Sequence, residues 1–314
     1  MKRLKSILLA GGVAALLAAL VTGCMSTINY AYKNGDKYTP GDRTISEKID
    51  TIDIDYMSGD VNFSCDSTNT ITIKETANKE ISDKMKVHTW VDGSTLYVRY
   101  CASAKSLDFN NIEKKLDITV PADVELENLR VDISSGSFTG NGIIAQDIDI
   151  SASSGKIDVD CTGKKIALDV SSGSIGLKQH GDSDSIKLDT TSGKIKAEVE
   201  NANKIKMSQT SGDVNFEGND IKDFDYDVTS GDGNFKFGKA PETSSFTGTS
   251  SDITIYIPSD SDLTADVDIT SGDFDYELGF EKKDGKYIAG SGANKMSIDT
   301  TSGDIEINQL KAGE

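Results

Sequence analysis

The sequence predicts an all-β protein, a flattened β-solenoid with about 19 residues and two strands in each repeat. Three observations predict this fold. A Ser-Gly motif recurs at a nearly fixed spacing, apolar and polar residues alternate on both sides of it, and no segment after residue 23 has the 3.6-residue apolar period of a long helix. A less regular β cap is expected at the N-terminal end, because an open stack of repeats needs a closing unit.

The recurring motif has its clearest form in residues 299–307, which read Asp-Thr-Thr-Ser-Gly-Asp-Ile-Glu-Ile. In one copy, Ser251 takes the place of the glycine. A spacing near 19 residues is the signature of stacked structural repeats. The motif glycines are Gly59, Gly136, Gly155, Gly173, Gly193, Gly212, Gly231, Gly272 and Gly303.

Strands are expected on both sides of each motif glycine. Around the fourth of these glycines, the apolar residues are Ile166, Leu168, Val170, Ile175 and Leu177, and the residues between them are polar or small. This period of two is that of a half-buried strand, and glycine accepts the positive φ of a tight corner. One repeat cannot bury its apolar side chains alone, so we expect consecutive repeats to stack in chain order, each touching its neighbours.

The first 23 residues are typical of a lipoprotein signal peptide. Basic residues open the chain, an apolar run covers residues 7–21, and the segment ends in Leu20-Val21-Thr22-Gly23-Cys24. This ending resembles a bacterial lipobox, in which the cysteine is lipidated and becomes the first residue of the mature chain. Lipidation of Cys24 would hold the protein on a membrane without a membrane-spanning helix. An ordinary signal peptide with a chance cysteine is the alternative.

After the signal peptide, the chain divides into three parts. Residues 24–44 are polar with scattered tyrosines, and we expect them to form a tether between the lipid and the folded domain. Residues 45–128 are expected to form the N-terminal β cap, and residues 129–310 the β-solenoid repeats. Asp92-Gly93 in the cap and Lys283-Asp284-Gly285-Lys286 in the last repeats predict hairpin turns.

The composition excludes some classes of partner. The formal net charge is −18, and removal of the signal peptide takes away three basic residues and no acid, which leaves about −21. A surface of this charge repels nucleic acid and anionic lipid headgroups. Aromatic residues are few and Trp90 is the single tryptophan, so the sequence shows no obvious platform for stacking sugar rings.

Aspartates recur at two positions of the repeat, four residues before the glycine and directly after it. Both positions are expected to point outward, so that stacking aligns them in ladders with neighbours about 4.8 Å apart. Two charges at that spacing repel by about 0.9 kcal/mol even in water. The earlier position holds Asp55, Asp132, Asp149, Asp169, Asp189, Asp227, Asp268 and Asp299. The later position holds Asp60, Asp213, Asp232, Asp252, Asp273 and Asp304.

Two explanations can offset this repulsion. In the first, the carboxylates accept backbone N–H groups at the turn, lysines interrupt the ladder, and salt screens the rest. In the second, the carboxylates bind Ca²⁺, which prefers clustered oxygen ligands. The nine-residue repeat of calcium-binding β-rolls is absent from the sequence, and no other cofactor is expected. The candidate Ca²⁺ ligands are Asp132, Asp149, Asp169, Asp189, Asp213 and Asp232.

No catalytic residue is predicted. The acids follow the repeat spacing, so no pair stands out as a general acid and a base, and His88 and His180 lie in dissimilar contexts. We expect His180 to be an exposed turn residue. Cys161 occupies a core position of its repeat. A disulfide between Cys65 and Cys101 is one alternative for an exported protein, and free thiols are the other.

Several motifs together resemble a known family. They are the internal Thr-Ser-Gly-Asp copies, an early unit from Ile52 to Val61, a strand that ends in Val120-Pro121, and Gly290-Ser291-Gly292 before the last repeat. Over about residues 45–310 the chain is similar to the adhesin-like proteins of the domain of unknown function DUF4097. The resemblance implies a β-solenoid-like fold, a cell-envelope location and no established catalytic residues.

We therefore expect a non-catalytic, lipid-anchored protein of the bacterial cell surface that presents an extended β-solenoid for adhesion or envelope scaffolding. Its expected partners are the membrane, through Cys24, and a surface glycan, a wall polymer or a protein, but not nucleic acid. A regulatory lipoprotein associated with envelope stress or signalling is the alternative. A glycan-active β-helix enzyme is the third interpretation.

Overall fold

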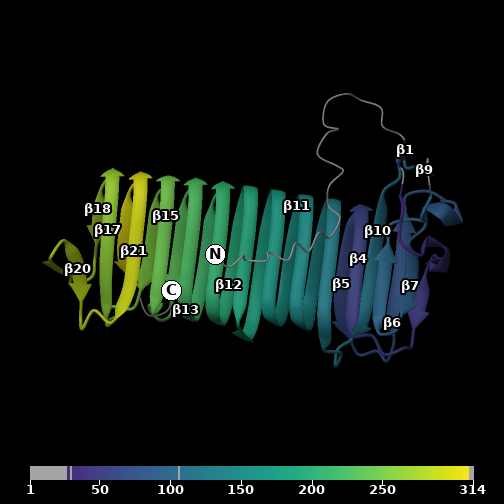
Figure 1. The fold of residues 1–314 in the computed structure, drawn as a ribbon, viewed down its shortest axis with the longest axis horizontal. Helices are drawn as coiled ribbons and strands as arrows, with labels where there is room; N and C mark the ends of the chain where they lie inside the picture. Colours follow the sequence, from purple (N-terminus) through teal and green to yellow (C-terminus); the bar gives the residue numbers. More distant parts are fainter. Residues whose placement is uncertain (1–26, 29, 105–106, 311–314) are drawn as a thin grey trace, which may run out of the picture.

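The computed structural model describes residues 27–28, 30–104 and 107–310. Most of these residues lie in β-strands, and the helices among them are the short 3-10 turns η1 (Gly35–Lys37) and η2 (Asp83–Met85). The predicted all-β class is confirmed, and the strands line up in one long row of solenoid-like repeats (Figure 1). The signal peptide and Cys24 lie outside the described residues. Within the described part of the chain, no helix is long and apolar enough to cross a membrane.

Three long strands build the middle of the row and wind through several coils, where a coil is one circuit of the chain named by its corner residue. Neighbouring coils pair in parallel, so that Ile166 lies opposite Ile186 and Ile195 lies opposite Val214. Residues at the same position of successive repeats therefore lie side by side. The long strands are β11 (Leu126–Ser183), β12 (Ser185–Ser211) and β13 (Val214–Ser230).

The apolar columns from the two sides of each coil meet in a shared interior. Phe224 precedes the corner at Gly231 and Phe235 follows it, and their rings lie 5.5 Å apart in an edge-to-face arrangement. The ring of Phe216, from the preceding coil, lies 4.9 Å from that of Phe224. All three phenylalanines are at most 1 % exposed, and burial of each contributes about 1.5–3 kcal/mol. The interior is a continuous core, as stacked repeats require.

Each regular corner is a glycine with positive φ, from 108° at Gly59 to 153° at Gly193. A Cβ atom on Gly155 would collide with the carbonyl oxygen of Gly136, and the same holds for each later pair up to Gly231. Glycine is thus required at each corner for two reasons, the positive φ of the backbone and the close approach of the neighbouring coil.

At the C-terminal end, the coils do not stack in chain order, contrary to our expectation. The last two strands of the sequence lie between the coils of Ser251 and Gly272, because Phe246 pairs with Ile298 and Ile298 in turn pairs with Val267. The outermost coil is therefore the second to last in the sequence. The strands of this end are β14 (Gly233–Phe237), β15 (Thr243–Ser250), β16 (Ile253–Ile257), β17 (Leu263–Ser271), β18 (Phe274–Tyr276), β21 (Asn294–Ser302) and β22 (Ile305–Gln309).

A hairpin makes this reversal possible. Strands β19 (Glu281–Lys283) and β20 (Lys286–Ala289) follow the Gly272 coil and pair across Asp284-Gly285, which confirms the predicted turn. Strand β20 also pairs antiparallel with the beginning of β17, so the hairpin covers part of the outer sheet edge. An uncovered edge would be open to pairing with other chains. The chain then returns between the Gly272 coil and the Ser251 coil to form the inserted coil.

The N-terminal end uses the same arrangement. The Gly59 coil lies between the first β11 coil and an outer layer, because Ile54 pairs with Val131 on one side and with Val98 on the other. The predicted hairpin at Asp92-Gly93 is confirmed by the antiparallel strands that flank it. The strands of this end are β1 (Thr27–Ile28), β2 (Thr39–Pro40), β3 (Arg43–Ile45), β4 (Thr51–Ser58), β5 (Asp60–Asp66), β6 (Ile71–Ala77), β7 (His88–Asp92), β8 (Thr95–Arg99), β9 (Leu107–Asp108) and β10 (Lys114–Pro121).

The expected tether at residues 24–44 is shorter than we predicted. The backbone N–H of Tyr30 donates to the carbonyl oxygen of Ala104 at 2.8 Å, and the N–H of Tyr32 donates to Ser103 Oγ at 3.0 Å. From Tyr30 onward, the chain therefore lies on the cap. The tyrosines of this segment pack on one another and on β7, which tether residues in solvent would not do.

A buried ion pair, absent from the sequence predictions, ties the cap together. The Lys114 ammonium group lies 2.7 Å from Glu75 Oε1 and also donates to the carbonyl oxygens of Met85 and Tyr100, at 2.7 and 2.5 Å. Glu75 Oε2 accepts the N–H of Val87 at 2.8 Å. The side chains of Lys114 and Glu75 are 0 % and 4 % exposed. Each ammonium proton has an acceptor, which offsets the cost of burying the charge.

The three cysteines among the described residues are free thiols, so the alternative of a Cys65–Cys101 disulfide is not formed in this structure. Cys65 lies in β5, which pairs with β10 and β11, whereas Cys101 follows β8, which pairs with β4 and β7. Cys161 is 1 % exposed and belongs to the core, as predicted.

Candidate functional site

The aspartates that we considered as Ca²⁺ ligands lie on the outer surface, in two columns on either side of the glycine corner. Asp169 lies directly opposite Asp189 in the parallel register. Among the residues that the structure describes, however, no three His, Cys, Asp or Glu side chains come together as a metal site. Neighbours within a column are therefore brought together, but a Ca²⁺ centre is not assembled. The column before the corner holds Asp132, Asp149, Asp169 and Asp189, and the column after it holds Asp213 and Asp232.

Backbone N–H groups stabilise the column after the corner. Asp252 Oδ1 accepts the N–H of Asp304 at 2.8 Å, and Asp304 Oδ1 accepts the N–H of Asp273 at 2.9 Å. Each of these carboxylates accepts a hydrogen bond from a backbone N–H of the neighbouring coil. Lys194, which interrupts the column, lies 3.1 Å from Asp213. These backbone donors and Lys194 offset part of the repulsion within the column after the corner.

The column before the corner is less well compensated. Asp55 lies opposite Asp132 on one side and opposite Arg99 on the other. Burial raises the pKa of Asp55 to about 6, because it outweighs the opposing charge of Arg99 and is assisted by Asp132. Burial likewise raises the pKa of Asp169, with the neighbouring charge of Asp189 as the second cause. At these two positions of the column, the charged form of the carboxylate is disfavoured.

A hollow of about 320 Å³ lies along the turns opposite the glycine corners. One row of outward side chains crosses it, because Lys178 lies opposite Glu198, Glu198 opposite Glu217, and Glu217 opposite Lys236. Two lysines therefore flank two glutamates on four successive coils. We call this surface the charged groove, and its rim includes His180, Glu200 and Asn219.

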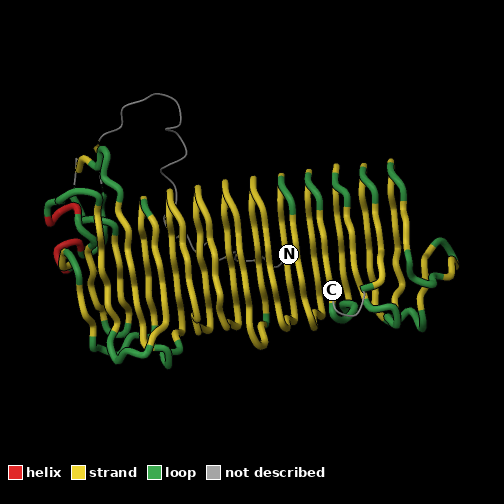
Figure 2. Tube along the Cα trace, turned by 180° about the vertical axis from the view of Figure 1, so that it is seen from behind, coloured by secondary structure: helices red, strands yellow, loops and turns green. Residues whose placement is uncertain are grey.

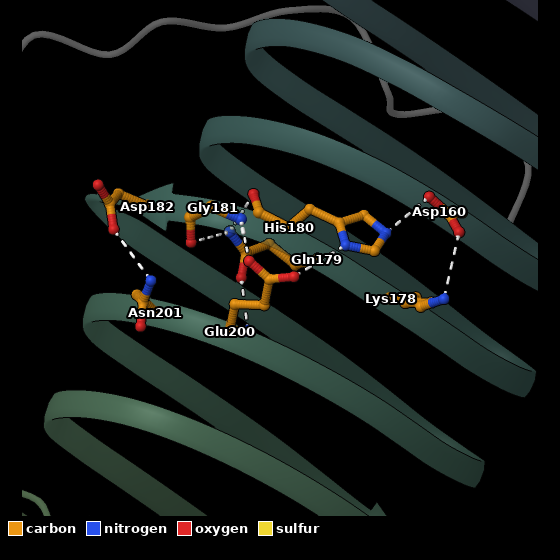
Figure 3. A network of polar contacts seen from close by, with 8 residues as sticks. All are labelled: Asp160, Lys178, Gln179, His180, Gly181, Asp182, Glu200 and Asn201. Carbon is orange, nitrogen blue, oxygen red and sulfur yellow. Dashed lines mark hydrogen bonds and ion pairs between the residues drawn. The ribbon is translucent and has the colours of Figure 1, made fainter.

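A hydrogen-bonded network holds the rim of the charged groove in place (Figure 3). His180 Nε2 lies 3.1 Å from Asp160 Oδ1, and His180 Nδ1 lies 3.1 Å from Glu200 Oε1. Glu200 Oε2 also accepts the N–H of Gly181 at 2.7 Å, and the N–H of Glu200 donates to Gln179 Oε1 at 3.1 Å. Three successive turns are joined in this way.

His180 makes contacts that the prediction of an exposed turn residue did not include. Its side chain is 37 % exposed and lies between two carboxylates. A neutral imidazole has one N–H and can donate to one of them, whereas the protonated ring donates to both. The N–H of Gly181, together with His180, lowers the pKa of Glu200. The sequence contains a signal for this contact, because Asp160 and Glu200 lie 20 residues before and after His180, which is one repeat in each direction.

The charged groove offers hydrogen-bond donors and acceptors in a regular row. Adjacent strands place successive side chains of the row about 4.8 Å apart. The four side chains of the row are exposed or half-buried. Each already forms an ion pair at the surface, Lys178 with Asp160, Glu198 with Lys196, and Glu217 with Lys236, and a ligand would have to compete with these weak pairs. A row of this kind can bind an extended polar molecule along the stack by ion pairs and hydrogen bonds.

Comparison with protein families gives one match. The family model described as Toastrack DUF4097 matches residues 49–308. Among curated proteins, none matches the chain in sequence.

Among the solved structures that match this chain are three from two Parabacteroides species. A structure from Parabacteroides merdae, described as a “putative adhesin”, covers 90 % of this chain and 100 % of its own chain, with 12 % identity and a TM-score of 0.50. One from Parabacteroides distasonis, with the same description, covers 86 % and 96 %, with 12 % identity and a TM-score of 0.45. A “putative lipid binding protein” from Parabacteroides distasonis covers 87 % and 97 %, with 16 % identity and a TM-score of 0.39. At these identities the likeness concerns the fold alone.

Proposed function

Since this chain belongs to the Toastrack DUF4097 family, we propose that it is an exported, lipid-anchored envelope protein that binds an extended polymer of the cell surface through the charged groove. The observation that carries the proposal is the row of Lys178, Glu198, Glu217 and Lys236 within one hollow. The proposed role is adhesion or envelope scaffolding, and it assigns no catalytic residue and no resident cofactor to the chain.

The regular spacing of the row favours a polymer over a small ligand. Each coil contributes one charged side chain, and parallel pairing repeats the arrangement at the strand spacing of about 4.8 Å. A flexible surface glycan or wall polymer carries hydroxyl and charged groups along its length, so several of its units can contact the row at once. Several weak contacts on one chain increase the total affinity without any single strong site.

The anchor is proposed from the sequence around Cys24. An apolar run of residues 7–21 followed by a cysteine is the pattern of a lipidated bacterial protein. Replacement Cys24→Ser tests this part of the proposal in the native host. The wild-type protein should stay with the membrane fraction after a salt wash, and the variant should be released. A variant that stays bound as firmly as the wild type would show that lipidation does not anchor the chain.

Capture from envelope fractions tests the binding role. The mature protein, immobilised on beads, is expected to retain a wall polymer or surface glycan, identified by sugar and phosphate analysis of the eluate. Retention of a membrane sensor protein without polymer would instead support the alternative role in envelope stress or signalling. Recovery of neither material above the level of uncoated beads would contradict adhesion.

A further inference from the structure

An aromatic cluster covers the N-terminal end of the stack. Its rings follow one another at centroid distances of 5.1 Å from Tyr30 to Tyr32, 5.8 Å from Tyr32 to Tyr38, 5.6 Å from Tyr38 to Trp90, and 5.3 Å from Trp90 to Tyr97. We call these five residues the end cluster. The sequence suggested few aromatic surfaces, and this one forms because the segment from Tyr30 folds back onto β7 and β8.

The end cluster is amphipathic rather than buried in the core. None of its five side chains is fully buried, in contrast to Tyr56 and Tyr100 nearby, which are at most 1 % exposed. The Lys37 ammonium group lies 4.8 Å from the centre of the Trp90 ring. Partly exposed Trp and Tyr rings beside a cation, here those of Trp90 and Tyr38, are the side chains that lipid headgroup regions favour, because one part of each ring is apolar and another is polar.

The position of the end cluster along the chain brings it close to the proposed anchor. Thr27 pairs with Asp108, so the chain already lies on the cap three residues after Cys24. Three residues span at most about 10 Å. Figure 2 shows η1, which lies between Tyr32 and Tyr38 in the sequence, and η2, which precedes Trp90, at the same end of the stack. A lipid on Cys24 would therefore hold this end against the bilayer, with the rest of the stack extending away from it.

The local charge is compatible with such a contact. Residues 30–43 carry Lys33, Lys37 and Arg43 against Asp36 and Asp42, so this segment has a small positive charge while the whole chain is at −18. The acidic faces of the repeats would be repelled by anionic headgroups, but this end is spared that repulsion.

We propose that the end cluster is a second membrane contact, in which Trp90, Tyr38 and Lys37 lie in the headgroup region of the bilayer. The inference rests on the membrane location in the proposed function, which it deepens by fixing which end of the stack faces the lipid. A lipid anchor and an interfacial aromatic contact are two weak signals that strengthen each other. The charged groove, several coils away, then faces the space beyond the membrane.

Trp90 is the single tryptophan, so its fluorescence reports on this contact alone. The mature chain from Met25 is held on phosphatidylcholine vesicles by an N-terminal histidine tag bound to a chelating lipid, which replaces the natural anchor. Part of the phosphatidylcholine is brominated near the headgroup. We expect the bromolipid to reduce Trp90 emission about twofold. Bromine quenches tryptophan only at short range, so this loss requires Trp90 to lie in the headgroup region.

A matched control moves the tryptophan to the opposite end of the stack. The double variant Trp90→Phe/Tyr276→Trp places it in β18, where the native side chain is 43 % exposed. Its emission should be the same with brominated and unlabelled vesicles. Equal emission of Trp90 in both kinds of vesicle would overturn the membrane contact. Because the tag supplies the anchor, that result is independent of the Cys24→Ser experiment, which tests lipidation.

Discussion

The carbonyl oxygen of Gly173 occupies the place where a Cβ atom on Gly193 would have to lie. The same relationship joins each regular corner to the next, so the corners stack backbone against backbone. Gly193 also has a φ of 153°. A side chain at this corner is therefore excluded both by the neighbouring carbonyl oxygen and by the backbone conformation. Because each contact joins glycines one repeat apart in the sequence, the repeat length determines which residues meet at the corners of neighbouring coils.

Substitution of one corner glycine should therefore open the stack locally. We expect Gly193→Ala to lower the free energy of unfolding by about 2–4 kcal/mol, through strained φ and displaced backbone. Urea unfolding measures the change. Gly279→Ala is the control, because a Cβ atom there meets nothing within 4 Å and its φ is not positive. Equal stability of the two variants would show that the corner contact is absent.

The buried pair of Lys114 and Glu75 should be sensitive to loss of one partner. We expect Glu75→Gln to destabilise the protein by about 3–5 kcal/mol, since it leaves a buried ammonium group without its counter-charge. The adjacent Lys115 lies at the surface, 3.3 Å from Asp117 and 52 % exposed. Lys115→Gln should leave the urea midpoint nearly unchanged. A small effect of Glu75→Gln would mean that water reaches Lys114.

Asp55 should make stability depend on pH. Its pKa is raised from 3.8 to about 6 in the folded protein, so the folded state binds more protons than the unfolded state between these values. Stability should accordingly fall as the pH rises from about 4 to 6 and stay lower above that. We expect Asp55→Asn to be more stable than the wild type by about 1–2 kcal/mol at pH 7.5 and equal to it near pH 3.5. Thermal unfolding at both pH values checks this, and a less stable variant at pH 7.5 would contradict it.

Removal of divalent cations should leave the stack intact. The carboxylates after the corner already bind backbone N–H groups, as between Asp252 and Asp304. We expect EDTA to change the melting temperature by less than about 1 °C, and calorimetry with Ca²⁺ to show no saturable binding. A cation-dependent melting temperature would restore the Ca²⁺ array that the aspartate ladders suggested.

The sequence predicts the features that repeat and misses those that occur once. The alternation around each corner gives the strands, and Asp92-Gly93 gives a hairpin that the structure contains. The order of the last coils has no local signal, because Ile255 could pack equally well beside Ile307 or Tyr276 in the same column. The structure pairs it with Ile307, and the choice depends on where the hairpin of β19 and β20 sends the chain.

The site was missed for a related reason. Lys178, Glu198, Glu217 and Lys236 differ in type, so they read as variable turn residues, although each is five residues after its corner. A column of unlike charges has no compositional signal and becomes visible only when the coils are stacked. The pair of Lys114 and Glu75 is similar, since 39 residues and several strands separate its members.

The role of the charged groove is tested most directly by comparing two charge variants in the capture experiment. Lys178→Ala/Lys236→Ala removes two cations from the groove. Lys187→Ala/Lys206→Ala removes two lysines from other coil surfaces and leaves the same net charge. Loss of two ion contacts of about 0.7 kcal/mol each lowers affinity about tenfold. We predict that the groove variant retains about one tenth of the wall polymer that the wild type retains, and that the second variant retains as much as the wild type. Equal retention by both variants would contradict binding at the groove.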